Sequence, residues 1–294
     1  MHGAAGREAV TAMRNGAAAI LFTLLAICAG SAGAEDAAPA RVVSIHLCAD
    51  QFVLALADRK QIASVSWLAT DDRRSHMATQ AAGLRPNNGT AEEIVSLRPD
   101  LVLAGFRSAR STAAALRALG YRVVDLEFAT DFTVIRRQIR ELARLLGQSA
   151  RGEEMIAEMD ERLARAAADT PAIRPVAAIY QPMGFTSGRG SLEHALMTAA
   201  GFDNLAEKLG MGALGHLPLE ALVSAKPAVL VNWMGNDPAP SLARSFYDHP
   251  ALTGDPWRTL SLPNKFWACG AWYSALAVER LAGLRRDLPA GRRQ

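Results

Sequence analysis

One short phrase occurs twice in the sequence and constrains the fold more than any other feature. The first copy, EEIVSLRPDLVL, covers residues 92–103, and the second, EALVSAKPAVLV, covers residues 220–231. Both copies contain a glutamate, an apolar pair, a serine, a basic residue, a proline and a closing apolar run. The copies start too far apart for a solenoid, whose period is about 20–50 residues. The spacing instead favours two similar domains of about 100 residues each.

Each copy predicts a short helix, a break at the proline and a buried strand. Glutamate favours the positively charged N-terminal end of a helix. Proline ends a helix and biases the residue before it toward extended structure. The Leu and Val run that follows is typical of a parallel strand buried on both faces.

The first 34 residues have the pattern of a cleavable export signal. Arg14 is followed by an apolar run at residues 17–29, which is too short to span a bilayer, and by small residues at 32–34. We therefore expect residues 1–34 to be a signal peptide and the mature chain to be periplasmic. Cys28 raises the alternative of a lipid anchor, although the residue before it is bulkier than such sites prefer.

The composition argues against nucleic-acid binding and against a further membrane span. The chain has 294 residues, is 50% hydrophobic and carries a net charge of +3. Nucleic-acid binding usually needs a concentrated basic stripe, which this chain lacks. Beyond the export signal, no apolar run is long enough to span a bilayer. We therefore expect a soluble exported chain with no nucleic-acid partner.

Patterns of strand and helix alternate in both halves of the chain. This alternation predicts an α/β fold with parallel sheets. The strands expected from apolar runs cover residues 42–47, 62–67, 101–104, 121–126, 175–180, 229–231 and 257–262. Between the first two strands we expect a helix over residues 51–57 with Asp50 as its N-cap. The polar stretches at residues 71–88 and 203–217 are expected to be loops.

A mostly helical stretch separates the two halves. Apolar residues from Ile135 to Leu146 recur on one helical face. A second helix, over about residues 150–168, would span roughly 28 Å. The expected domains are an N-terminal lobe over 41–146, a linking helix within 147–170 and a C-terminal lobe over 171–288.

Aromatic and basic residues follow several of the expected strands. Ligands of open α/β sheets bind beyond the carboxyl ends of the strands. Such side chains suit a large, flat or partly anionic ligand. The candidate ligand-binding residues are Trp67, Arg107, Arg110, Phe185, Trp233, Trp267 and Trp272.

Motifs for catalysis are weak. The chain contains no G-x-S-x-G nucleophile turn, and the Gly188–Gly190 pair lacks the third glycine of a dinucleotide loop. His46, Cys48 and Asp50 alternate past a strand end and could meet a metal. The alternative function is therefore a periplasmic metalloenzyme or metallochaperone that uses His46, Cys48 and Cys269. The two cysteines could equally pair with each other, contact a ligand or be inert.

The chain resembles the periplasmic binding proteins for ferric siderophores, haem and cobalamin, which serve ATP-driven importers. The resemblance covers nearly all of residues 41–288 and is carried by the two copies of the phrase and by FTSGRGS at 185–191. It implies two Rossmann-like lobes joined by one long rigid helix, with the ligand held in the cleft between them. It also implies a monomer with no enzymatic activity and no resident cofactor or metal.

The resemblance further implies a partner and a ligand class. One surface glutamate per lobe, Glu92 and Glu220 by position, would meet arginines of the membrane permease, whose ATPase drives import. The ligand would be a metal chelate, either a ferric siderophore or a cobalamin-type corrinoid. The chain departs from the cobalamin-binding members at residues 85–89 and at Gly105, where those members place aromatic residues. Which chelate binds stays open at this point.

Overall fold

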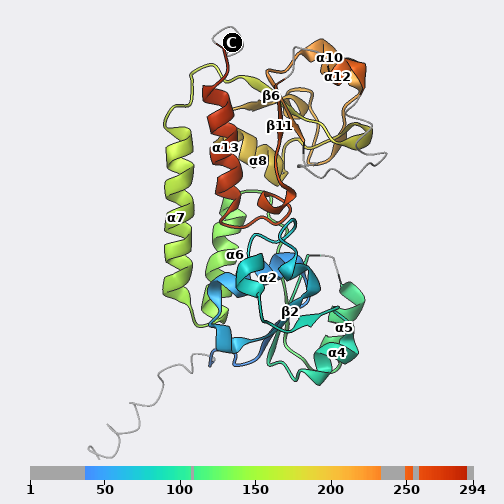
Figure 1. The fold of residues 1–294 in the computed structure, drawn as a ribbon, viewed down its shortest axis with the longest axis vertical. Helices are drawn as coiled ribbons and strands as arrows, with labels where there is room; N and C mark the ends of the chain where they lie inside the picture. The colour runs from blue at the N-terminus through green and yellow to red at the C-terminus, as the bar shows by residue number, and fades with distance from the viewer. Residues whose placement is uncertain (1–36, 107–108, 233–248, 254–257, 290–294) are drawn as a thin grey trace, which may run out of the picture. The chain divides into compact units, whose positions relative to one another are not determined.

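Two parallel sheets form the frame of the fold, as the alternation of strands and helices predicts (Figure 1). The α/β class is therefore confirmed. The computed structural model describes residues 37–106, 109–232, 249–253 and 258–289. The expected signal peptide lies outside these residues.

Lobe 1 is the first sheet together with the helices that cover it. Its five strands are parallel, in the order β3-β2-β1-β4-β5. Their bounds are β1 Val42–Ser44, β2 Ile62–Ser66, β3 Pro86–Asn87, β4 Leu101–Ala104 and β5 Val123–Asp125. The helices are α2 Leu47–Leu56, α3 Ala78–Ala81, α4 Ala91–Ser96 and α5 Arg110–Ala118. The central strands β1 and β4 are buried throughout, as expected of parallel strands covered on both faces.

Lobe 2 is the second sheet together with its helices. Its four parallel strands follow the order β11-β10-β6-β8, and a separate antiparallel pair joins β7 to β9. The strands are β6 Val176–Ile179, β7 Phe185–Thr186, β8 Asp203–Asn204, β9 Gly215–His216, β10 Val229–Asn232 and β11 Arg258–Ser261. The helices are α8 Leu192–Ala199, α9 Leu205–Lys208, α10 Leu219–Ala225, α12 Pro250–Thr253 and α13 Ser274–Arg286.

The expected loops contain short elements that the sequence pattern does not reveal. Residues 71–88 include α3 and β3, and residues 203–217 include β8, α9 and β9. Each of these strands is only two residues long, so no alternation of apolar and polar residues can develop along it. Neighbouring strands and helix ends determine these elements instead.

A helical pair connects the lobes. α6 (Phe132–Leu145) packs against α7 (Ser149–Ala167), which runs beside lobe 1 at one end and beside α13 at the other (Figure 1). The α7 bounds match the helix expected over about residues 150–168. One hydrophobic core extends from β1 through both helices into α13, so the lobes share a buried interior.

Close packing and ion pairs hold α7 in place. A Cβ added at Gly152 of α7 would lie 2.5 Å from the Cβ of Ala143 of α6, so this glycine lets the two helices approach closely. Toward lobe 1, Arg151 of α7 binds Asp58, which follows α2, at 3.1 Å. Toward lobe 2, Arg162 binds Glu279 of α13 at 3.1 Å.

The repeated phrase repeats in backbone conformation as well as in sequence. In each copy a helix, α4 or α10, is followed by a basic residue, a proline and a buried strand. Arg98 and Lys226 both have a φ of 46°, in the left-handed region. The expectation of extended structure before the proline is therefore wrong. Proline disfavours the right-handed helical region for the residue before it, and here the chain escapes to the left-handed side.

Asp50 does not cap α2, contrary to expectation. The helix begins earlier, at Leu47, and the ring Nδ1 of His46 accepts the capping hydrogen bond from the N–H of Cys48 at 3.1 Å. Asp50 is fully buried within the first turn and accepts a hydrogen bond from the backbone N–H of Ser66 at 2.9 Å and one from its hydroxyl. Burial raises the pKa of this carboxyl to about 7.

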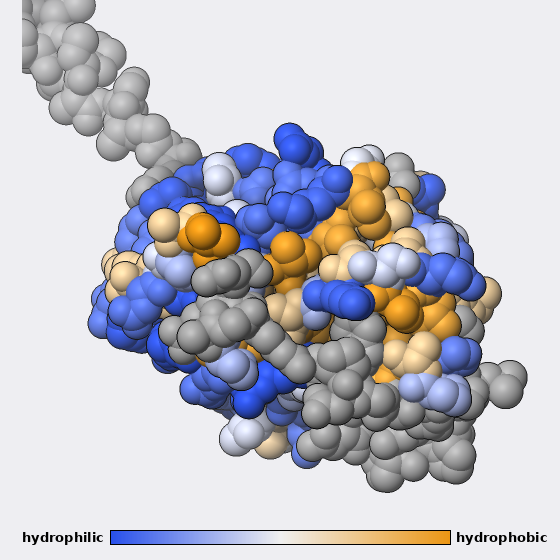
Figure 2. Space-filling view, turned by 90° about the horizontal axis from the view of Figure 1, so that it is seen from above, coloured by the Kyte–Doolittle hydropathy of each residue, from blue (hydrophilic) through white to orange (hydrophobic). Residues whose placement is uncertain are grey.

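In the described residues, no helix is both long enough and apolar enough to cross a membrane. In the view of Figure 2, hydrophilic residues predominate at the left and top of the face, and apolar residues gather at its centre and right.

The buried carboxyl of Asp50 predicts a pH dependence of stability. The folded pKa of about 7 exceeds the ordinary value of 3.8, so the folded state binds this proton more tightly than the unfolded chain. The stabilisation is complete below about pH 4 and is lost as the pH rises through about 7, with a total of up to about 4 kcal/mol. Asp50→Asn should remove this slope in urea unfolding between these pH values. The exposed control Glu92→Gln should keep it, and an unchanged slope in Asp50→Asn would contradict the assignment.

Candidate ligand-binding site

A cavity of about 470 Å³ lies between the two lobes. Its volume falls within the range of about 300–1,000 Å³ that small-molecule sites occupy. Both lobes contribute to the wall. The wall includes His46, Cys48, Phe106, Glu127, Phe128, Leu192, Glu193, Trp267 and Cys269.

Aromatic rings line both sides of the cavity. In lobe 1, Phe106 follows β4 and Phe128 follows β5, and their ring centroids lie 5.3 Å apart in a tilted arrangement. Phe106 is 44% exposed and Phe128 is 55% exposed, so part of each residue is accessible at the cavity. In lobe 2, Trp267 lines the cavity from a buried position after the short helix η4 (Asn264–Phe266). The site therefore offers flat apolar surfaces to its ligand.

The titratable groups of the lining are acids and one histidine. Glu193, in the first turn of α8, is partly buried, and burial raises the pKa of its carboxyl. Glu127 is exposed at the rim and binds Arg137 of α6 at 2.5 Å. Burial lowers the pKa of His46, which favours the neutral ring. Among the described residues that line the cavity, none is a lysine or an arginine.

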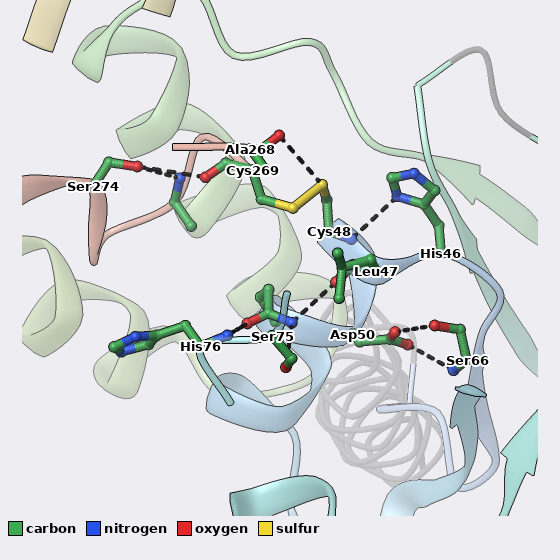
Figure 3. The surroundings of a disulfide bond; sticks show 12 residues. His46, Leu47, Cys48, Asp50, Ser66, Ser75, His76, Ala268, Cys269 and Ser274 are labelled. Atoms are coloured by element: carbon green, nitrogen blue, oxygen red, sulfur yellow. Dashed lines mark hydrogen bonds between the residues drawn. A yellow bond between two sulfur atoms is a disulfide. The ribbon is translucent and has the colours of Figure 1, made fainter. Parts of the chain in front are cut away.

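The neutral ring of His46 has a defined orientation. Its Nδ1 accepts from the backbone N–H of Cys48, so the ring hydrogen sits on Nε2 (Figure 3). The ring also lies against the end of β4, where a Cβ added at Gly105 would come within 2.2 Å of the His46 Cγ. Gly105 therefore admits the histidine ring. The contact gives a physical reason for glycine at this position, where by the resemblance described above the cobalamin-binding members place an aromatic residue.

A disulfide joins the lobes at the cavity. Cys48, in the first turn of α2, is bonded to Cys269 of lobe 2, which is 221 residues away in the sequence (Figure 3). Both cysteines line the cavity. The sequence left open whether the two cysteines pair, contact a ligand or are inert, and the structure shows that they pair. The metal site built on His46, Cys48 and Cys269 is wrong, because disulfide sulfurs are not thiolate ligands. Elsewhere in the described chain, no group of three metal-ligating side chains occurs.

Of the residues expected to bind ligand, Trp267 lines the cavity. Four others do not line it in the structure: Trp67, Arg110, Phe185 and Trp272. Trp67 and Phe185 are exposed elsewhere, and Arg110 is exposed at the start of α5. Trp272 is partly buried and packs edge-on against Phe52. Arg107 and Trp233 lie outside the described residues.

Three lining residues escaped the sequence analysis although a usable signal existed. Glu127 and Phe128 follow β5 after one intervening residue, Leu126, and so lie beyond a strand end like the candidates named after the other strands. Glu193 is placed by the first turn of α8, behind its N-cap Ser191, and this turn was considered only as a failed dinucleotide loop. The strand-end rule applies to all strands of a sheet, including its edge.

The two repeated glutamates lie away from the cavity. Glu92 is exposed in the first turn of α4, and Glu220 is exposed in the first turn of α10. In the view of Figure 1, α4 and α10 lie at opposite ends of the structure, both on the side away from α7.

Comparison with known proteins identifies the family of this chain. Residues 42–253 match the family described as periplasmic binding protein. The chain belongs to the periplasmic binding protein family. The resemblance inferred from the repeated phrase is thereby confirmed, and so is the expectation that the chain is not an enzyme, since the family and its relatives are solute-binding proteins.

Two sequence relatives are cobalamin-binding proteins of Halobacterium salinarum. A cobalamin-binding protein of Halobacterium salinarum strain R1 is 31% identical over 206 residues, which are 69% of this chain and 56% of the relative. The cobalamin-binding protein of strain NRC-1 matches to the same extent. The chain thus spans little more than half the length of these relatives.

Solved structures share the fold of this periplasmic binding protein. The apo form of the haem-binding protein RhuT from Roseiflexus sp. RS-1 has a TM-score of 0.65 and 22% identity, with 82% of this chain and 96% of that chain covered. The vitamin B12 binding protein BtuF of Vibrio cholerae has a TM-score of 0.62 and 17% identity, with 83% and 96% covered. At these identities the likeness concerns the fold alone.

The contact between Gly105 and His46 can be tested by a double-mutant cycle. Gly105→Ala should displace the ring and break the helix cap, at a cost of about 1–3 kcal/mol in the free energy of unfolding. In a His46→Ala background the added methyl meets no ring, so Gly105→Ala should cost close to nothing. Urea unfolding of the four proteins gives the coupling energy. Equal costs in both backgrounds would show that the ring does not occupy this space.

Proposed function

We propose that this periplasmic binding protein captures a cobalamin-type corrinoid and delivers it to an ATP-driven importer. The observation that carries the ligand class is the cavity lining, with its paired phenylalanines, its buried tryptophan and its acidic side chains. The similarity to the cobalamin-binding proteins of Halobacterium supports the same choice.

Charge discriminates among the chelates that such proteins carry. Haem bears two propionates and many ferric siderophores are anionic, so both would meet the carboxyl of Glu193 at the described wall, whereas the charge of Glu127 is paired with Arg137. A corrinoid instead carries neutral primary amides around its ring, and amide N–H groups donate hydrogen bonds to carboxylates. Burying a charged group without a partner is costly. The acidic lining therefore favours the corrinoid.

The aromatic pair supplies surface for the flat part of the ligand. Phe106 and Phe128 come from two adjacent strands, β4 and β5, so their rings are held by one sheet edge. Trp267 and Leu192 face the ligand from lobe 2. Such a largely pre-formed site binds without chemical change. The cavity thus fits a carrier that binds and releases its ligand intact.

Delivery requires a surface that the importer can recognise, and we propose Glu92 and Glu220 for that role. Each is exposed in the first turn of a helix, and the two helices belong to the repeated units of the two lobes. An exposed carboxylate can accept two hydrogen bonds from one guanidinium group. One such acid on each lobe suits a permease that presents arginines to both. Export to the periplasm places the protein where this contact occurs.

Ligand identity can be tested by titrating tryptophan fluorescence with cyanocobalamin, haemin and a ferric hydroxamate. Cyanocobalamin should bind most tightly. Phe106→Ala and Phe128→Ala should each raise its Kd by about threefold to tenfold, because aromatic contacts contribute about 0.5–1.5 kcal/mol. Phe185→Ala, which removes an exposed ring outside the cavity, should leave the Kd unchanged. Tight haemin binding with no cyanocobalamin binding would refute the corrinoid.

Docking can be tested separately from binding. Glu92→Arg and Glu220→Arg should each abolish cobalamin uptake in cells that depend on this protein, while the Kd for cyanocobalamin stays unchanged. Like charges would then face each other at the permease. Glu154→Arg, an exposed acid on α7, is the matched control and should support normal uptake. Normal uptake by the double variant at Glu92 and Glu220 would exclude the docking role.

A further inference from the structure

Residues 265–273 of lobe 2 contact lobe 1 directly, and this set of contacts is called the seam below. Besides the disulfide of Cys269, the Nζ of Lys265 donates to the backbone carbonyl of Asp72 at 3.0 Å. The ring of Tyr273 stacks on His76 with 4.3 Å between the centroids. These contacts all come from residues 265–273 of lobe 2, and the disulfide is the covalent member of the seam (Figure 3).

The disulfide sits within the ligand site rather than behind it. His46 lies two positions before Cys48 and is oriented by the N–H of that cysteine. Trp267 lies two positions before Cys269 on the other lobe. All four residues line the cavity. The bond therefore ties together the chain segments that present the histidine of one wall and the tryptophan of the other.

We infer that the Cys48–Cys269 disulfide is a positioning element of the ligand site, which sets the spacing of the two cavity walls and is itself covered by bound ligand. The inference about ligand rests on the proposed function, whereas the inference about wall spacing does not. α7 and the shared core hold the lobes on one side. The disulfide holds them at the cavity, so reduction leaves only the non-covalent members of the seam there.

Two consequences follow for binding. When the two walls are already held at the spacing of the bound state, ordering the site costs less free energy on binding, and the affinity is higher. This difference in affinity appears mainly as a slower dissociation rate. Loss of the disulfide should therefore weaken binding chiefly through faster release. A ligand that fills the cavity also covers the bond, because both cysteines line it. Bound ligand should therefore slow attack by an external thiol.

The redox step has a simple balance. Dithiothreitol attacks the S–S bond as a thiolate and supplies two electrons, and the two cysteine sulfurs take up protons and become thiols. The reagent closes to its own cyclic disulfide. In the oxidising compartment where exported proteins reside, the reverse step needs a disulfide oxidant.

The spacing of the walls can be measured without any ligand. A keto amino acid that carries a spin label is placed at Ser96 and at Ser224, equivalent exposed positions of the two repeated units. Pulsed dipolar spectroscopy then compares the oxidised protein, the protein reduced with dithiothreitol, and Cys48→Ser/Cys269→Ser. Loss of the bond should broaden the distance distribution in both altered forms. Identical distributions in all three would overturn the inference about spacing. Circular dichroism tests whether the serine variant is folded. If the variant is unfolded, the comparison between the oxidised and the reduced native protein decides the inference.

Cyanocobalamin is the probe for the role of the disulfide in ligand binding. The Kd of the double serine variant should rise by about tenfold, with most of the change in the dissociation rate. Saturating cyanocobalamin should slow the reduction of the native disulfide by dithiothreitol severalfold. The rate of reduction is measured by alkylating the freed thiols and counting them by mass spectrometry. An unchanged Kd together with an unchanged reduction rate would overturn the role in ligand binding. If the oxidised protein does not bind cyanocobalamin at all, the proposed corrinoid fails, and the distance measurement still decides the inference about spacing.

Discussion

The arrangement of the ligand site depends on the packing of α7 against α6 and α13. Gly152 allows α7 to approach α6 so closely that a single methyl group would clash with Ala143. The ion pairs of Arg151 with Asp58 and of Arg162 with Glu279 then link the helix to the two lobes. Partly exposed ion pairs contribute little stability each, whereas the shared apolar core contributes in proportion to its buried area. The shared core therefore contributes more than the ion pairs to holding the lobes together.

The sequence predicts the frame of this fold because the frame depends on patterns that repeat along the chain. Helix α6 follows from the periodicity of its apolar residues, and the buried strands follow from apolar runs. The repeated phrase even marks a shared backbone detail, since Arg98 and Lys226 adopt the same left-handed conformation. The sign of φ at these residues was not predictable, because proline excludes one region without choosing between the others.

The site was less predictable because it is assembled from single residues on different elements. Trp267 was expected, while Phe128 and Glu193 were not, although all three line the same cavity. An aromatic residue after a strand can point into the cleft, as Phe128 does, or pack against the core, as Trp272 does. That choice depends on neighbours that are distant in sequence. Composition therefore identifies a set of candidates, and only the fold selects among them.

The trio of His46, Cys48 and Asp50 shows why an alternating pattern can mislead. In a strand, residues two apart point to the same face, so the trio would form one cluster. Here α2 begins at Leu47, and residues two apart on a helix do not face each other. Cys48 consequently turns toward lobe 2 and forms the disulfide, whereas Asp50 turns into lobe 1 and binds Ser66. A helix start moved by a few residues therefore converts an apparent metal site into a covalent link between lobes and a buried acid.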